Sequence, residues 1–90
     1  MTIALAENLD LKAAAPLRTA LMEARGAPAN IDATNVQRLG GLCLQVLLSA
    51  EATWATDGQP FTISAASPAF AEGALRMGAQ SLVPDLIIQE

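Results

Sequence analysis

Few side chains in this 90-residue chain could carry out covalent or acid–base chemistry. The chain has no His, no Tyr and a single Cys, Cys43. These absences remove imidazole bases, His-ligated metals and Cys-based metal cages. The remaining residue types offer no combination of nucleophile, base and orienting group. We therefore expect a protein that is not an enzyme and that holds no metal and no cofactor.

The one thiol, Cys43, has two interpretations. Near the start of a predicted helix it could have a lowered pKa and act as a redox-sensitive group. In an apolar run of sequence, however, a Cys is more often a small buried hydrophobic residue, and we favour that interpretation. Because a single Cys cannot form an internal disulfide, nothing indicates an oxidising compartment. A cytoplasmic location is expected.

The pair Gly40-Gly41 lies just before the same predicted helix. Free backbone N–H groups and the helix dipole can bind an anion at such a place, which would suit a small ligand or a nucleotide. A Gly pair is also typical of a tight turn that lets a loop meet a helix, and we favour the turn. Leu42, the next residue, falls on the polar side of the helix. It either contacts a partner from an exposed position or is buried under a loop.

Carboxylates, hydroxyls and an indole complete the candidate groups. Asp10 and Asp32 each end a predicted strand and could face one another near Gly40, but we interpret them as turn and cap residues. Thr34 lies in the loop before Gly40 and is the remaining candidate to accept a phosphate, although a turn role fits it better. Trp54, the only Trp, either anchors a partner or caps the core.

Charge and length exclude several classes of partner. The net charge is −4, and the five cations are scattered along the chain. Binding to nucleic acid needs clustered Lys and Arg, so we expect no nucleic-acid partner. The most apolar stretch, residues 39–50, is much shorter than the roughly 20 residues that span a bilayer, so no membrane insertion is expected. Residues 1–6 lack the charged region of a signal peptide.

Two amphipathic segments are predicted to position the candidate residues. Residues 13–25 carry apolar residues at i, i+4 and i+7, which predicts a helix. Pro16 fits its first turn, and Gly26 suits the position just after its end. Residues 42–53 are apolar over a broad arc, which predicts a helix that is buried on more than one side.

A third helix and several short strands complete the pattern. Ser67 is the expected N-cap of this helix. The helix carries an apolar stripe that reaches Met77, and it is expected to stop at Gly78. Strands are predicted at residues 2–6, 29–32 and 61–64, and in at least one of the segments 82–83 and 86–88. Strands that alternate with helices favour an α/β architecture with a mostly parallel sheet. Residues 1–90 are expected to form one domain.

Three segments of the chain together resemble a known family. Residues 7–10 (Glu-Asn-Leu-Asp) are similar to the G-x-L-D loop of STAS domains, named after sulfate transporters and anti-sigma factor antagonists. Residues 31–44 resemble the family's strand, loop and helix start, where D-S-S-G-L is usual. Residues 61–64, 67–68 and 78 resemble its third strand, S-P helix start and helix-ending Gly. The resemblance implies a STAS-like fold, with a four- to five-stranded sheet and three to four helices.

The chain departs from the family where the family is regulated. In phosphorylated members, the first Ser of D-S-S-G-L accepts phosphate from a partner kinase, and this position here is Gly41. The preceding Asp is replaced by Gly40, the second Ser by Leu42 and the Gly by Cys43, whereas Leu44 keeps the family residue. The resemblance therefore implies that phosphorylation cannot switch this protein at the usual position.

The resemblance also implies a function and a binding surface. We expect a regulatory module similar to anti-sigma factor antagonists, which binds an anti-sigma factor or a chemotaxis-type kinase. The expected surface comprises Asp10, Asp32 and residues 40–43. One alternative is a constitutive STAS subunit of an ABC-type lipid transporter, with the transporter ATPase as its partner. Another is a small-ligand or nucleotide binder, and a homodimer is also open.

Overall fold

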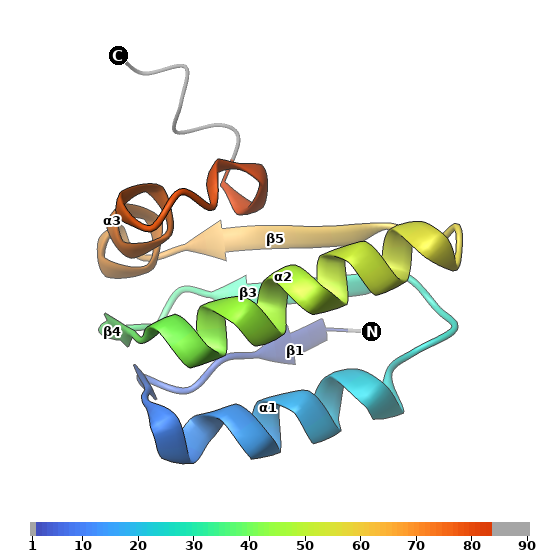
Figure 1. Cartoon of the computed structure of the whole chain (residues 1–90), viewed down its shortest axis with the longest axis horizontal. Coiled ribbons are helices and arrows are strands. Elements are labelled where there is room, and N and C mark those ends of the chain that lie inside the picture. Colours follow the sequence, from blue (N-terminus) through green and yellow to red (C-terminus); the bar gives the residue numbers. More distant parts are fainter. Residues whose placement is uncertain (1, 84–90) are drawn as a thin grey trace.

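The computed structural model describes residues 2–83, in which short strands alternate with helices. Figure 1 shows these elements coloured along the chain. In chain order they are β1 (Thr2–Ala4), β2 (Asn8–Leu9), α1 (Leu11–Glu23), β3 (Ala29–Ala33), β4 (Arg38–Leu39), α2 (Gly41–Thr56), β5 (Phe61–Ala66), α3 (Pro68–Arg76) and the short 3₁₀ helix η1 (Gln80–Leu82).

All strand pairs among the described residues are parallel, which confirms the predicted fold class. One sheet has the order β1-β3-β5, and a second consists of β2 and β4. The five strands thus form two sheets, of three and two strands. Strand β1 ends at Ala4 and strand β3 ends at Ala33. The two segments that follow these strands pair with each other again at β2 and β4. The carbonyl of Glu7 joins the two segments by accepting from the backbone N–H groups of Gln37 and Arg38.

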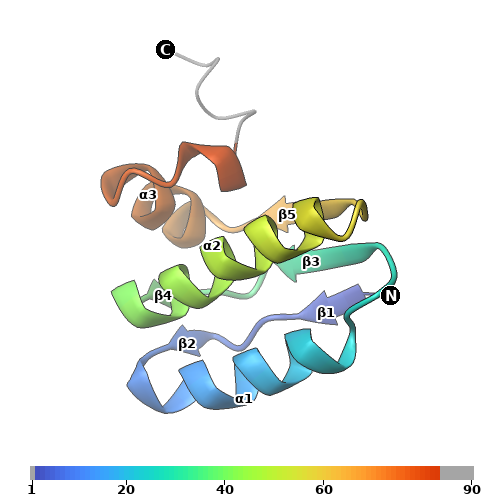
Figure 2. The same cartoon turned by 45° about the vertical axis from the view of Figure 1, so that its right-hand side comes forward.

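The hydrophobic core lies between the three-stranded sheet and the helices. Helices α1 and α2 run side by side across one face of this sheet (Figure 1, Figure 2). The side chains of β3 alternate as this arrangement requires, because Ala29, Ile31 and Ala33 are buried whereas Asn30 and Asp32 are half-buried. Within residues 2–83, no helix has the length and apolar character needed to cross a membrane.

Helix α1 begins two residues earlier than predicted. Asp10 is its N-cap, and the carboxylate accepts hydrogen bonds from the backbone N–H groups of Lys12 and Ala13, both at 3.1 Å. Pro16 therefore lies inside the helix, and the prediction that it occupies the first turn is wrong. The capping bonds of Asp10 and the strong helix propensity of the neighbouring Ala residues outweigh the preference of Pro for the first turn.

Helix α3 begins as predicted and ends one residue earlier than predicted, at Arg76. Ser67 is the N-cap, and its hydroxyl accepts from the N–H of Phe70 while it donates to the carbonyl of Val36. Gly78 follows the helix with a φ of +81°, a conformation that favours Gly. Met77 does not extend the buried stripe, since its side chain is 43% exposed. It is the C-cap, where the backbone leaves helical geometry, so helical spacing no longer directs its side chain.

Residues 82–83, one of the two segments in which a closing strand was expected, do not form a strand. Residues 80–82 form η1, and the N–H groups of Leu82 and Val83 bond to the carbonyls of Ala79 and Gln80. These local bonds replace the cross-strand bonds that a strand would make. Leu82 and Val83 are nevertheless buried, which explains their apolar character. The other predicted strand segment, 86–88, lies outside the described residues.

Candidate functional site

The starts of α1 and α2 lie next to each other because the strands before them are paired. Leu9 of β2 is in register with Leu39 of β4, and each is followed by the N-cap of a helix. The N–H of Gly40 donates to the carbonyl of Leu9 at 2.9 Å, and the Cys43 thiol donates to the carbonyl of Asp10 at 3.3 Å. The structure thus brings together three of the predicted site residues, namely Asp10, Gly40 and Cys43.

Gly40 lets the two helix starts approach closely. A Cβ atom at this position would lie 2.8 Å from the carbonyl oxygen of Leu9, a distance that real Cβ atoms do not adopt. The structure therefore supports the tight-turn interpretation of this residue. Because the N–H of Gly40 is already donated to Leu9, it is not free to bind an anion.

Gly41 differs from its neighbour, because nothing in the structure requires it to be Gly. It is the first residue of α2, it is exposed, and a Cβ atom would find nothing within 4 Å. Position 41, which the resemblance of residues 31–44 matches to the phosphate-accepting Ser, is therefore open to solvent and has room for a side chain. Leu42 beside it is 49% exposed, as a contact with a partner would require.

Leu11 is a second exposed apolar residue at this end of the molecule, and the sequence patterns did not point to it. It is 77% exposed and is the first residue of α1, as Gly41 is of α2. The predicted helix begins at residue 13, so the prediction leaves Leu11 outside it. The interpretation of Asp10 as a cap residue, applied to this helix, would have placed Leu11 at the first position of the helix. We call residues Asp10, Leu11, Gly41 and Leu42 the helix-start surface.

Cys43 is a buried hydrophobic residue. Its side chain has no exposed surface, and burial, followed by the nearby charge of Asp10, raises the pKa of the thiol. The interpretation as a thiol with a lowered pKa is therefore wrong, because burial disfavours the charged thiolate. Within residues 2–83, no three His, Cys, Asp or Glu side chains lie close enough together to hold a metal ion.

Asp32 and Thr34 form a turn of their own after β3. One carboxylate oxygen of Asp32 accepts from the hydroxyl of Thr34 at 2.6 Å and from its N–H at 3.0 Å. These bonds lower the pKa of Asp32. Asp32 is the second-to-last residue of β3 in the three-stranded sheet, whereas Asp10 follows the two-stranded sheet and uses its carboxylate to cap α1. The two aspartates are thus a turn residue and a cap residue, as interpreted from the sequence.

Trp54 belongs to the core. It is 2% exposed, its indole N–H donates to the carbonyl of Ala27 at 2.8 Å, and its ring centroid lies 5.7 Å from that of Phe61. The alternative that it anchors a partner is wrong, since the ring is covered and its donor is satisfied within the chain.

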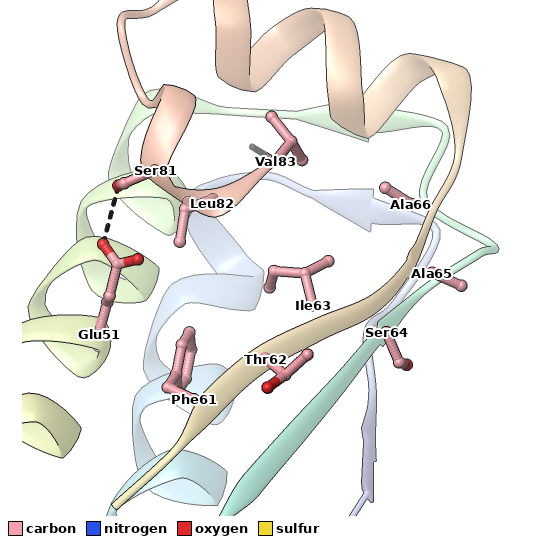
Figure 3. A pocket seen from close by; sticks show the side chains of 10 residues that line it. All are labelled: Glu51, Phe61, Thr62, Ile63, Ser64, Ala65, Ala66, Ser81, Leu82 and Val83. Carbon is pink, nitrogen blue, oxygen red and sulfur yellow. Dashed lines mark hydrogen bonds between the residues drawn. The ribbon is translucent and has the colours of Figure 1, made fainter. Parts of the chain in front are cut away.

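A hollow beside β5 is separate from the helix-start surface. It has a volume of about 450 Å³ and lies between β5, η1 and α2 (Figure 3). Phe61, Ile63, Leu82 and Val83 give it an apolar side. Its one charged lining residue, Glu51, accepts a hydrogen bond from the hydroxyl of Ser81 at 2.9 Å. The lining residues contain no pair of groups suited to acid–base chemistry.

The geometry defines a small α/β domain with an exposed apolar surface at the starts of two adjacent helices. A protein-family model described as "Mlab, STAS domain" matches residues 1–84. The chain therefore belongs to the STAS domain family, whose members are generally non-enzymatic modules that mediate protein–protein interactions. Comparisons with curated proteins and with solved structures gave no match.

Proposed function

We propose that this STAS domain is a regulatory module that docks onto a kinase-like or anti-sigma partner through the helix-start surface. The observation that carries this proposal is the exposure of Leu11 and Leu42 at adjacent helix starts, at 77% and 49%. Exposed leucines gathered at one end of a small domain are typical of a binding surface. The affinity then comes mainly from apolar contact, and the module catalyses nothing.

In this proposal the module regulates its partner only by being bound to it or not, and no modification of the module is involved. Gly41 stands where family members carry the phosphate-accepting hydroxyl, and it offers only backbone. The hydroxyl of Thr34, the other candidate acceptor, is held by the Asp32 carboxylate. Binding is then controlled by the amounts of the module and its partner rather than by modification. Residues 1–90 act as one cytoplasmic domain, and nucleic acid is not a partner.

Replacing Leu42 with Asp is expected to weaken binding to a co-encoded kinase-like or anti-sigma protein by about tenfold or more, because a charge would have to be desolvated in an apolar contact. Isothermal titration calorimetry measures the change. Met77→Asp is the matched control, since Met77 is similarly exposed but lies at the end of α3. Equal affinity of the wild type and the Leu42→Asp variant would show that α2 is not part of the interface.

A second candidate function is that of a constitutive subunit of an ABC-type lipid transporter. The observation that favours it is again Gly41, because a subunit that braces an ATPase permanently needs no phosphate acceptor. Adjacent genes for a permease and an ATPase would support this candidate. Adjacent genes for a sigma regulator or a chemotaxis kinase would support the regulatory module.

The third candidate, a ligand site at Gly40-Gly41, has less support. Of the two N–H groups proposed to bind an anion, that of Gly40 is already donated to the Leu9 carbonyl. A nucleotide titration followed by the amide chemical shifts of residues 40 and 41 tests this candidate, and shifts confined to those two amides would favour it.

A further inference from the structure

A groove runs between α1 and α2 on the side of these helices that faces away from the sheet. It has a volume of about 490 Å³. Figure 1 and Figure 2 show the two helices lying side by side in the same direction, with their starts at the same end. On α1 the lining residues are Arg18, Leu21 and Met22, which lie at i, i+3 and i+4 on one face of the helix. Arg25 lines the groove from the turn that follows α1.

The lining of the groove combines apolar residues with the exposed polar residues Gln45 and Ser49. Leu21 and Ala50 are buried, Val46 is half-buried, and Met22 is 57% exposed at the rim. Leu42, which lines one end, also belongs to the helix-start surface. From Leu42 to Trp54 the lining residues cover 12 steps of α2, which is about 18 Å or three helical turns. The groove is therefore long enough for one short helix.

The charge of the groove is opposite in sign to that of the chain. The chain has a net charge of −4, yet both charged residues that line the groove are arginines and no carboxylate lines it. Arg25 pairs with Asp57 at 2.9 Å, and this ion pair joins the ends of α1 and α2. Arg18 is exposed, and the structure of residues 2–83 shows it in no ion pair. Arg18 therefore presents a positive charge at the rim of the groove.

We infer that the α1–α2 groove binds an amphipathic helix of the partner protein, with apolar residues at i, i+4 and i+7 and with carboxylates beside them. The apolar residues would cover Met22 and Val46, and a carboxylate would pair with Arg18. This inference rests on the proposed function, which it deepens by naming the chemistry of the partner segment. A second copy fits less well, because pairing groove to groove would place like charges together.

The test uses a displayed library of helical peptides of about 14 residues, which is about four turns. The library is selected on the full chain, and the dominant peptide is then titrated by calorimetry. We expect selected peptides with the apolar spacing above and an excess of Asp and Glu. Arg18→Glu should weaken their binding at least about fivefold, and Arg18→Gln should weaken it less. Circular dichroism confirms that both variants are folded.

Two variants separate this inference from the proposed function. Leu11 does not line the groove, so Leu11→Asp should leave binding of the selected peptide unchanged while it weakens binding of the whole partner protein. A library that yields no helical pattern, peptides rich in Lys and Arg, or equal binding by the wild type and Arg18→Glu would each overturn the inference. The proposed function fails separately, if Leu11→Asp and Leu42→Asp both leave the affinity for the partner protein unchanged.

Discussion

Gly40→Ala is expected to lower the free energy of unfolding by about 2–3 kcal/mol. The added Cβ would lie 2.8 Å from the carbonyl oxygen of Leu9, so either the start of α2 or the end of β2 must move. The hydrogen bond from the Gly40 N–H to the same carbonyl would be strained by that movement. Urea denaturation followed by far-UV circular dichroism measures the loss.

Gly41→Ala is the matched control one residue away. A Cβ atom there meets nothing within 4 Å, and Ala has a higher helix propensity than Gly, so the free energy of unfolding should stay the same or rise by up to about 1 kcal/mol. If both variants were equally stable, the close approach of β2 to the start of α2 would be contradicted. The Gly pair of the sequence would then be a flexible linker.

Trp54→Ala is expected to lower the free energy of unfolding by about 3–5 kcal/mol. The substitution removes a ring that is 98% buried, its contact with Phe61 and the hydrogen bond to the Ala27 carbonyl. In a 90-residue domain, a loss of this size is a large part of the total stability, which is about 5–15 kcal/mol for a typical protein. Thermal and urea denaturation followed by circular dichroism measure it, since the variant has no other Trp.

Trp54→Phe divides this effect into its parts. Phe retains most of the ring packing but cannot donate to Ala27, so the expected loss is about 1–2 kcal/mol. A role of Trp54 in partner binding predicts a different pattern. Under that role, Trp54→Ala would leave the stability almost unchanged and would abolish binding, and this result would contradict the assignment of Trp54 to the core.

The sequence predicted the elements that local rules determine. Ser67-Pro68 marks the start of α3, and Gly78 follows its end with a positive φ, because each depends on backbone chemistry within a few residues. The same kind of rule misplaced the start of α1. Pro16 prefers a first turn, but the Asp10 carboxylate caps the helix at residue 11, and the periodicity of apolar residues does not contain that information.

Part of the site depends on contacts that no local pattern shows. The place of Leu42 on the polar side of its helix left exposure and burial under a loop both open, and the structure shows it 49% exposed. Leu11 was missed because its exposure depends on where α1 begins. The steric need for Gly at residue 40 arises from Leu9 of β2, which lies 31 residues earlier in a strand that pairs with β4. The division of the strands into two sheets likewise depends on where pairing resumes after residue 33.

In the proposed function, Gly41 marks the difference from phosphorylated family members, because the resemblance of residues 31–44 places it at the position of their phosphate-accepting Ser. The position is exposed and open, so the absence of a hydroxyl is not imposed by packing. The Thr34 hydroxyl is the nearest substitute in the sequence, and its bond to Asp32 occupies it. A module of this kind can regulate a partner by being bound or unbound, and it needs no kinase or phosphatase of its own.

The most direct measurement of this mode of action is the intact mass of the protein isolated from cells, combined with its affinity for the partner before and after phosphatase treatment. We predict a single unphosphorylated species whose affinity does not change with the treatment. A phosphorylated species that binds the partner more weakly, and that regains affinity when the phosphate is removed, would contradict regulation by occupancy alone.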